Sequence, residues 1–505
     1  MKKTKFLLVL LCLCMLLPIA ACGKSSTNDN NTNEDKYYYD DSSRERASDS
    51  IPEGYSLDGA TVTLTSPTGY LYANGPIDQI GDAETTDLVY SRIYERNLSV
   101  QERLNFVLEF YHPTGTTWQD CGTEIHQAIL AMSQVFDIVM SGDNAIIQGK
   151  KFNYYHDLND SNYIDTSSPW WYEDAIMEVS VDNYNYRFLF GDININNLSR
   201  AGCVFYNKEL YEQYLSPTKN RDELYTKVLE GNWTLEEFSR LVKAGNIEKG
   251  GDGSGNLHGF IIDHGEYPHY FRESAGIRMY ARNDYGMPVF DFNDDKSVNF
   301  AVSLYQLFFE NEGVVNINYS GHSTEASFTN GQVFFDPGNL SDVLNTTMRE
   351  MKDDFGILPY PKWDEYQDEY VTLIHNSSTI TAIPVSSDID YANEELSAVI
   401  EALCSESYRR VAVSFYETAL KAAYNRDDQS AQMIDIICGQ HDTVKSTLTK
   451  NFAYEYSGSL GGIGNIFGNL IGNRSYNFAS SYDSIIGSVD TALRNLIQEY
   501  KEGKI

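Results

Sequence analysis

The sequence of 505 residues is poor in cysteine and in basic residues. It has seven cysteines, and 38 Lys and Arg stand against 72 Asp and Glu, which gives a formal net charge of −34. No Cys-x-x-Cys pair or other metal-ligand spacing occurs, so we expect neither a disulfide framework nor a metal site. The negative charge would repel phosphate groups, and this excludes nucleic acid as a partner.

The signatures of common enzymes are also missing. The sequence contains no Gly-x-Ser-x-Gly, no phosphate-binding Gly-x4-Gly-Lys motif and no His-Glu-x-x-His. His258, His264 and His269 lack the i, i+4 spacing of a zinc pair on a helix. We therefore expect no enzyme and no cofactor. A surface glycosidase stays open as an alternative, because glycoside hydrolysis needs only two suitably spaced carboxylates.

The N-terminus has the pattern of a secretion signal. Three lysines among the first five residues precede the apolar run Phe6–Leu17, which is too short for a membrane span of about 20 residues. The sequence Ile-Ala-Ala-Cys that ends at Cys22 resembles the lipobox of bacterial lipoproteins. This resemblance implies a signal peptide at 1–21 and lipidation of Cys22. The alternative is an ordinary signal that leaves Cys22 as a free thiol.

A polar tether and then an α/β chain are expected after the signal. Residues 23–50 are almost free of aliphatic side chains, so 22–55 is predicted to be a flexible tether. Alternating strand and helix patterns then occur at 60–65, 87–104, 106–110, 124–132 and 136–140. This order predicts a parallel α/β architecture.

Further elements are expected along the rest of the chain. Strands are predicted at 186–195 and 202–206, and Thr234 with Glu237 forms a capping box that starts a helix. The Gly-rich segment 457–472 is predicted to be a loop. Additional helices are predicted at 297–310, 393–404, 408–423 and 484–500.

Five short segments in sequence order carry a resemblance to a known family. They are Phe136–Met140 (FDIVM), Val204–Leu210 (VFYNKEL), Trp233–Phe238 (WTLEEF), Phe328–Val333 (FTNGQV) and Phe355–Pro361 (FGILPYP). The chain resembles bacterial extracellular solute-binding proteins of the sugar type, in the superfamily of maltose-binding protein. One departure is Val333-Phe334, where relatives usually carry Ala-Met.

The resemblance implies a two-lobed α/β fold of the periplasmic-binding-protein type II, with a hinge between the lobes. The first lobe is expected to contain 56–194 and 323–371, and the second 195–322 and 372–505. It also implies a lipid-anchored receptor on the outer face of the bacterial membrane that captures an extracellular carbohydrate, expected to be an oligosaccharide, and delivers it to an ABC permease. We expect a monomer. A receptor for a peptide or another polar solute is the alternative within the same class.

Candidate ligand contacts follow from the chemistry of sugars. Hydroxyl groups are bound by carboxylates, amides and Arg, and open α/β sheets hold ligands at the carboxyl ends of their strands. These two rules select Ser141, Asp143, Asn144, Asp192, Asn194, Arg200, Asp336 and Asn339. The alternative for the first three is a loop that caps the next helix.

Aromatic platforms for sugar rings are expected among the tryptophans. The candidates are Trp118, Trp170, Trp171 and Trp363, whereas Trp233 is predicted to pack at a helix start. The cluster at 169–172 is interpreted as a sugar shelf or as a wedge between the lobes, and packing in the core is the alternative for each tryptophan.

Overall fold

The structure is a computed structural model. It describes residue 44 and residues 47–67, 77–149, 152–182, 185–249, 255–262, 267–316, 324–344, 346–422 and 428–503. The expected signal segment 1–21 and the expected lipid acceptor Cys22 lie outside the described residues, as does most of the tether 22–55. Tyr38–Ile505 forms one compact unit.

Four strands that we call the first sheet follow the expected α/β order. A parallel bridge between Leu64 and Ile138 links the parallel pair β1 and β2 to β3, and β12 pairs antiparallel with β3. The strands expected at 60–65, 106–110 and 136–140 are thus confirmed, with the third shifted toward the C-terminus. The bounds are β1 (Thr61–Thr65), β2 (Val107–Tyr111), β3 (Val139–Gly142) and β12 (Thr379–Ala382).

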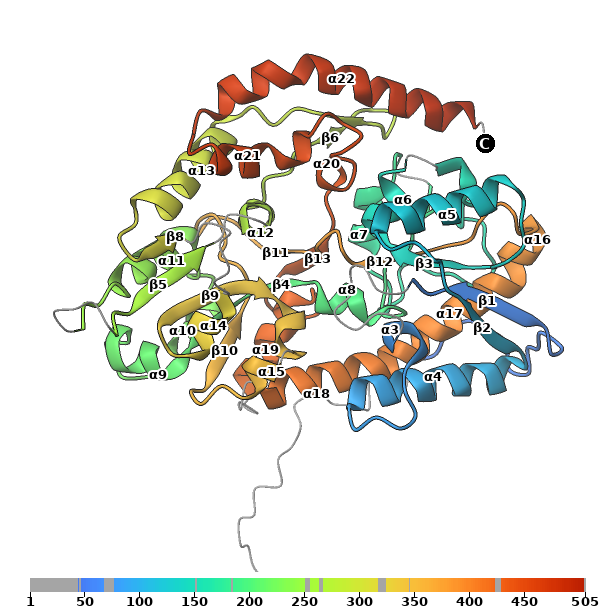
Figure 1. The fold of residues 1–505 in the computed structure, drawn as a ribbon, viewed down its shortest axis with the longest axis horizontal. Helices are drawn as coiled ribbons and strands as arrows, with labels where there is room; N and C mark the ends of the chain where they lie inside the picture. Colours follow the sequence, from blue (N-terminus) through green and yellow to red (C-terminus); the bar gives the residue numbers. More distant parts are fainter. Residues whose placement is uncertain are drawn as a thin grey trace, which may run out of the picture. The chain divides into compact units, whose positions relative to one another are not determined.

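A long amphipathic helix, α4 (Leu88–Leu104), connects β1 to β2, as expected. The Asp87 carboxylate caps it by accepting a hydrogen bond from the Val89 amide at 3.0 Å. Its buried apolar side chains share one face, and they are Val89, Ile93, Val100 and Leu104. The helical run of α17, η6 and α18 packs against α4 (Figure 1). Its bounds are α17 (Ser397–Glu406), η6 (Ser407–Val411) and α18 (Ala412–Ala422).

A five-stranded sheet has the order β10-β4-β9-β5-β8. β5 is parallel to β8 and β9, whereas β4 is antiparallel to β9 and β10. This pairing differs from the expected division of the chain, because β9 and β10 come from 323–371 but join strands from 195–322. The bounds are β4 (Gly202–Asn207), β5 (His258–Ile262), β8 (Val314–Asn316), β9 (Val333–Asn339) and β10 (Phe355–Leu358).

Two connecting segments join the first sheet to other strands. Segment 192–201 leads into β4, and segment 374–378 lies between β11 (Tyr370–Leu373) and β12. They meet at a bridge between Ala201 and Ile374. The strand expected at 186–195 is largely wrong, since only isolated bridges form at Leu189 and Gly191 and a helix begins at Ile195. The reason is local hydrogen bonding by side chains, such as the Asn197 amide that donates to the Gly191 carbonyl at 3.1 Å.

The expected helix start is confirmed at α11 (Leu235–Ala244), with Thr234 as its N-cap, whereas the Glu237 carboxylate of the expected capping box pairs with Arg240 instead. Thr234 Oγ1 accepts a hydrogen bond from the Glu237 amide at 3.2 Å. Replacing Thr234 with alanine is expected to lower the free energy of unfolding by about 1 kcal/mol, because this amide loses its partner. Denaturant unfolding measures the effect. Thr491→Ala, within an exposed part of a helix, is the control and should change it by less than about 0.5 kcal/mol.

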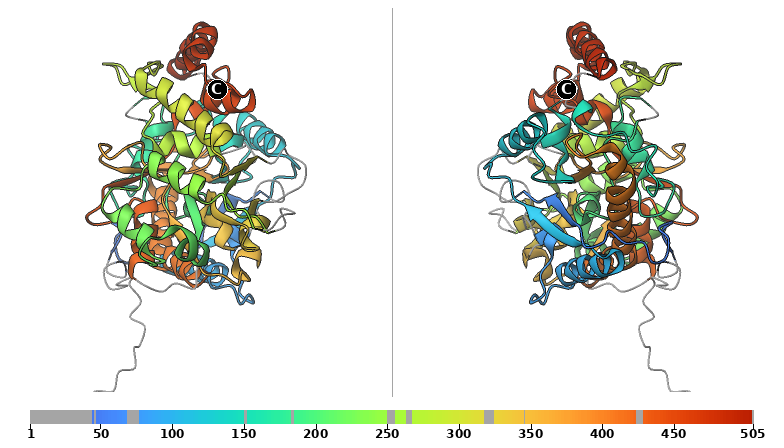
Figure 2. Two further views of the ribbon diagram at one scale, coloured as in Figure 1. Left: turned by 90° about the vertical axis from the view of Figure 1, so that its left-hand side faces the viewer. Right: turned by 90° about the vertical axis from the view of Figure 1, so that its right-hand side faces the viewer.

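The C-terminal region departs from expectation at one segment. The loop predicted at 457–472 is wrong over its second half, where α21 (Ile466–Gly472) forms. Its apolar residues face the core, and Phe467 stacks on Phe478 with ring centroids 4.9 Å apart. α22 (Phe478–Glu502) packs on α21 and on α13 (Asp295–Tyr305) (Figures 1 and 2). Tertiary burial therefore overrides the low helix propensity of glycine.

Shorter elements complete the fold. β11 (Tyr370–Leu373) pairs in parallel with β13 (Ser446–Thr449), and β6 (Ala281–Arg282) pairs with β7 (Pro288–Val289). The remaining helical segments are α3 (Ile77–Ile80), α5 (Trp118–Leu130), α6 (Asp143–Ile147), η1 (Phe152–Tyr154), α7 (Glu173–Val179), α8 (Ile195–Ser199), α9 (Lys208–Leu210), η2 (Tyr211–Leu215), α10 (Glu223–Leu229), α12 (Tyr267–Ser274), α13 (Asp295–Tyr305), η3 (Gln306–Glu310), α14 (Thr324–Thr329), η4 (Leu340–Leu344), α15 (Thr346–Arg349), α16 (Ile389–Tyr391), η5 (Ala392–Leu396), α19 (Asp428–Ile437), α20 (Phe452–Glu455) and η7 (Ile463–Asn465).

The described cysteines and helices agree with the composition. Cys121, Cys203, Cys404 and Cys438 are buried as thiols, so they pack as small apolar residues. Over the described ranges, no group of His, Cys, Asp and Glu side chains is arranged to hold a metal ion. None of the helices in these ranges combines the length and the apolar character needed to cross a membrane.

Candidate functional site

Polar residues stand at the carboxyl ends of β1 and β3. Ser66 follows β1, Ser141 lies near the end of β3, and Asn144 lies in the first turn of α6. Since β1, β2 and β3 run parallel, their carboxyl ends lie at the same edge of the first sheet. We call these three residues the strand-end site, which is where open α/β sheets bind ligands.

Each residue of the strand-end site carries a polar atom that is buried without a hydrogen-bond partner. These atoms are Ser66 Oγ, Ser141 Oγ and Asn144 Oδ1, and no described residue supplies a partner for them. The side chains are at most 8% exposed. A buried polar atom without a partner costs about 1–3 kcal/mol. A ligand rich in hydroxyl groups can satisfy all three atoms, because a hydroxyl both donates and accepts.

A buried ion cluster adjoins the strand-end site. Lys450, which follows β13, forms an ion pair with Asp143, and its Nζ lies 3.2 Å from Glu455 Oε1. All three side chains are completely buried. One cation thus faces two carboxylates. Burial and the charge of Asp143 raise the pKa of Glu455 to about 8, against the opposing effect of Lys450.

The cluster joins segments that are far apart in the sequence. Lys450 Nζ also donates to the His375 carbonyl at 3.0 Å, and Ser378 Oγ donates to Asp143 at 2.8 Å. Lys450 therefore ties α6, the connecting segment 374–378 and α20 together. Sequence reasoning selected Asp143 but missed Lys450, Ser378 and Glu455, because no local pattern marks these residues.

Aromatic rings lie beside this cluster. The His269 and Tyr454 rings are tilted by 32° with centroids 4.3 Å apart, and Tyr270 stacks on Tyr360 at 5.1 Å. His375 lies 6.1 Å from Tyr270 and 6.2 Å from Tyr454. His269, Tyr270, Tyr360 and Tyr454 are at most 7% exposed, so these rings pack the region beside the cluster.

The connecting segment 192–201 uses its predicted polar residues to hold the backbone. Asn194 Nδ2 donates to Thr381 Oγ1 at 2.9 Å, while Asn194 Oδ1 has no hydrogen-bond partner among the described residues. The Arg200 carbonyl accepts a hydrogen bond from the His375 amide at 3.1 Å. The structure thus brings Ser141, Asp143, Asn144, Asn194 and Arg200 to one region around β3, β12 and the connecting segments.

Two other predicted contacts lie in the five-stranded sheet. Asp336 stands opposite Phe205 and Asn339 opposite Gly202 in the pairing of β9 with β4. Asn339 ends β9, and its Oδ1 accepts a hydrogen bond from Ser341 Oγ at 2.5 Å. Asp336 was expected after the strand but lies in its middle, because β9 continues its pairing with β4 as far as Asn339. Both residues belong to a different sheet from Ser141.

The predicted aromatic shelf has a different structural setting. Trp170 and Trp171 are buried, and their indole nitrogens donate to the two carboxylate oxygens of Glu401 at 3.0 and 2.9 Å. Burial raises the pKa of Glu401 to about 8, although these two hydrogen bonds lower it. Trp118 opens α5, and Trp363 packs near Phe300. The four tryptophans do not form one surface.

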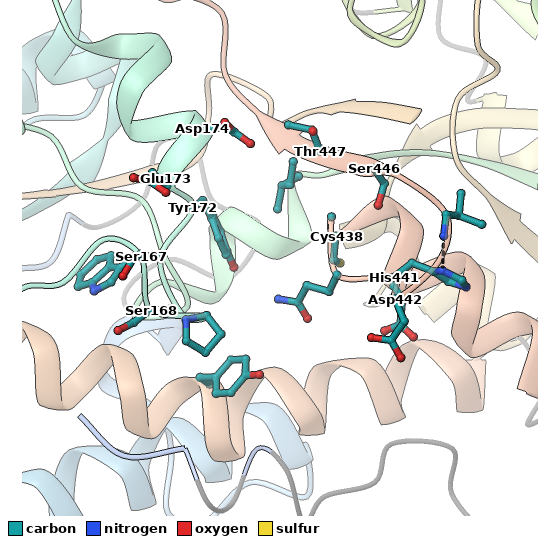
Figure 3. A pocket seen from close by; sticks show the side chains of 18 of the residues that line it. Ser167, Ser168, Tyr172, Glu173, Asp174, Cys438, His441, Asp442, Ser446 and Thr447 are labelled. Carbon is teal, nitrogen blue, oxygen red and sulfur yellow. Dashed lines mark hydrogen bonds between the residues drawn. The ribbon is translucent and has the colours of Figure 1, made fainter. Parts of the chain in front are cut away.

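A cleft of about 1030 Å3 lies elsewhere in the described chain, between residues 166–174 and residues 438–448. We call it the Tyr172 cleft. Behind its wall, the Tyr172 hydroxyl donates to the carboxylate of Asp192, which is buried. Figure 3 shows two facing groups of side chains, with Ser167, Ser168, Tyr172, Glu173 and Asp174 on one side and Cys438, His441, Asp442, Ser446 and Thr447 on the other.

Comparison with known proteins supports the fold. No protein-family model matches the chain, and no curated protein matches it significantly. Solved structures do match. A sugar transporter protein from Rhizobium etli in an open conformation is 12% identical, with a TM-score of 0.54 over 85% of this chain and 99% of that one. The maltose/maltodextrin-binding domain MalE from Bdellovibrio bacteriovorus, bound to maltotriose, is 11% identical, with a TM-score of 0.51 over 87% and 100%.

A third structure widens the range of ligands seen on this fold. UgpB from Mycobacterium tuberculosis, in complex with glycerophosphocholine, is 14% identical, with a TM-score of 0.50 over 82% of this chain and 98% of that one. The expected resemblance is confirmed at the level of the fold: the chain has the α/β fold of solute-binding proteins of the maltose-binding type.

Proposed function

We propose that this chain is a receptor that binds a carbohydrate at the strand-end site and delivers it to an ABC permease. The observation that best supports this proposal is that Ser66, Ser141 and Asn144 each have a buried polar atom with no hydrogen-bond partner among the described residues. Sugar hydroxyls match their mixed donor and acceptor character. The likeness in fold to the maltotriose-bound domain supports the same ligand class.

Binding in this proposal works by closure around the ligand. The connecting segments 192–201 and 374–378 link the first sheet to β4 and β11, so rotation within them brings the sheet ends together or apart. The buried rings of Tyr270 and Tyr454 border the ion cluster and pack against Tyr360 and His269. No bond of the ligand is broken, so the receptor needs no catalytic residue.

The same proposal places the mature protein on the outer face of the membrane, held by lipid on Cys22. The short signal-like run and the Ile-Ala-Ala-Cys sequence support this anchor. Cys22→Ser is expected to abolish labelling by a radioactive fatty acid and to release the protein from the membrane fraction. Retention of the label in this variant would contradict lipidation at Cys22.

Ligand binding is tested with the mature chain, its Cys22 replaced by serine, against a panel of mono- and oligosaccharides. A carbohydrate at 1,000 times its dissociation constant is expected to stabilise the chain by about 4 kcal/mol and to raise its Tm by several degrees. Asn144→Ala is expected to weaken binding about tenfold or more, because one sugar hydroxyl loses its partner. Asn159→Ala, at an exposed turn, is the control and should bind as the parent does.

The panel also separates the alternatives. Peptides and glycerophosphodiesters are included, and a response to these without any response to sugars would replace carbohydrate by another polar solute. The glycan is recovered after binding and its reducing ends are measured. Consumption of the glycan would favour a glycosidase, whereas unaltered glycan supports a receptor.

A further inference from the structure

The Tyr172 cleft is separate from the proposed carbohydrate site. None of the residues of the strand-end site lines it, and neither does the ion cluster around Lys450. Its walls come from the segment before and within α7 and from the segment between α19 and β13. The cleft therefore needs an explanation of its own.

The lining of the cleft is acidic. Glu173 and Asp174 stand on one wall and Asp442 on the other (Figure 3), and all three are exposed. Asp435 adds a fourth carboxylate. Among the described residues that line it, Arg44 is the one Lys or Arg. Carboxylates gathered in a concave surface concentrate cations, most strongly at low ionic strength.

A guanidinium group already occupies this cleft. Arg44 belongs to the polar segment that precedes the folded region, yet it is only 8% exposed. Its guanidinium carbon lies 4.3 Å from the centroid of the Tyr408 ring and 5.3 Å from that of Tyr416. It donates to Gln440 Oε1 and, at 3.5 Å, to the Tyr408 carbonyl. A cation over two aromatic rings with polar acceptors is a favourable arrangement for guanidinium or ammonium.

A buried carboxylate lies behind the place where the Arg44 guanidinium contacts the Tyr408 ring. Asp192 accepts a hydrogen bond from Tyr172 on one oxygen, and its other oxygen, Oδ2, has no hydrogen-bond partner in the described part of the chain. Burial raises the pKa of Asp192 to about 6, while Tyr172 and the charge of Arg44 lower it. The field of Arg44 thus reaches Asp192, and this carboxylate behind the wall adds to the attraction of the cleft for a cation.

We infer that the Tyr172 cleft is a second binding site, selective for the guanidinium or ammonium group of an organic cation, and that Arg44 is its internal occupant. Removing the Arg44 side chain frees the ring face of Tyr408 and takes away the one Lys or Arg among the described residues that line the cleft. A small dication such as agmatine then enters, with its guanidinium over Tyr408 and its ammonium toward Glu173 and Asp174.

The test measures agmatine binding by titration calorimetry at low ionic strength. The mature chain with Arg44→Ala is expected to bind agmatine at least about tenfold more tightly than the parent chain, in which Arg44 competes. The double variant Arg44→Ala/Tyr408→Leu is expected to lose this gain, because the ring face is gone. Arg494→Ala on the exposed face of α22 is the control and should bind agmatine as the parent does.

Three further outcomes decide the inference. Equal agmatine affinity of the parent and Arg44→Ala would overturn it, and so would a gain that persists without Tyr408. Binding of a neutral ureido analogue as tightly as agmatine would show a site without charge selectivity and would also overturn it. If Arg44→Ala fails to fold, Arg44→Gln keeps the length and polarity of the side chain, and the same comparison applies. Carbohydrate titrations on the same samples keep this result distinct from that of the proposed function.

Discussion

Replacing Lys450 with methionine is expected to lower the free energy of unfolding by about 3–5 kcal/mol. Among the described residues, Lys450 is the cation paired with Asp143 and Glu455, and both carboxylates are completely buried. Methionine fills a similar volume, so the loss arises from the uncompensated charge rather than from a cavity. Urea unfolding at pH 7, with the midpoint and slope fitted separately, measures the effect.

The matched control is Lys445→Met, five residues earlier in the chain. Lys445 pairs with Asp368, but both side chains are largely exposed, at 67% and 74%. Water and salt screen such a pair, so its loss should leave the unfolding midpoint unchanged. Equal losses for the two variants would show that the ion cluster around Lys450 does not act as a buried network.

The stability of the chain is expected to fall as the pH rises from 5.5 to 8, by on the order of 3 kcal/mol. Burial raises the pKa of Glu178 to about 7 and those of Glu401 and Glu455 to about 8. The unfolded chain loses these protons near pH 4.5, whereas the folded chain holds them to pH 7–8. Between these limits the folded state binds more protons, so the free energy of unfolding decreases with pH.

Glu178→Gln isolates one part of this dependence. The glutamine carbonyl can still accept the hydrogen bond that the Tyr280 hydroxyl gives to Glu178, and it does not ionise. We expect the fall in stability between pH 5.5 and 8 to shrink by about 1–2 kcal/mol, measured by urea unfolding at several pH values. The exposed Glu53→Gln serves as control and should keep the slope of the parent. A parent chain whose stability is flat or rises over this range would contradict the prediction.

Local patterns in the sequence predicted most of the elements that shape the strand-end site. The alternation at 60–65 and the apolar face of 87–104 became β1 and α4, because these periods report which side chains turn toward a core. The N-cap at Thr234 was equally local, since its hydrogen bond spans three residues. The prediction was wrong where burial competes with helix propensity. In α21 the glycines suggested a loop, although its apolar residues form a helix face that packs on the core.

Functional roles were harder to predict, because partners come from distant parts of the chain. Trp170 and Trp171 were candidate sugar platforms, but Glu401, about 230 residues away, accepts a hydrogen bond from both indoles. Lys450 reaches Asp143 across 307 residues and has no neighbouring motif. The contact of the Arg44 guanidinium with the Tyr408 ring joins the polar N-terminal segment to a helix that begins more than 350 residues later.

The sequence by itself determined the α/β class, the strand-end positions of Ser141, Asp143 and Asn144, and the absence of the enzyme motifs sought. These follow from periodicity, composition and residue spacing, which act over a few residues. Only the tertiary structure decided which carboxylates are buried, which cation neutralises them, and that β9 and β10 pair with β4. Burial and charge pairing depend on how distant segments meet in space, and no local pattern encodes that meeting.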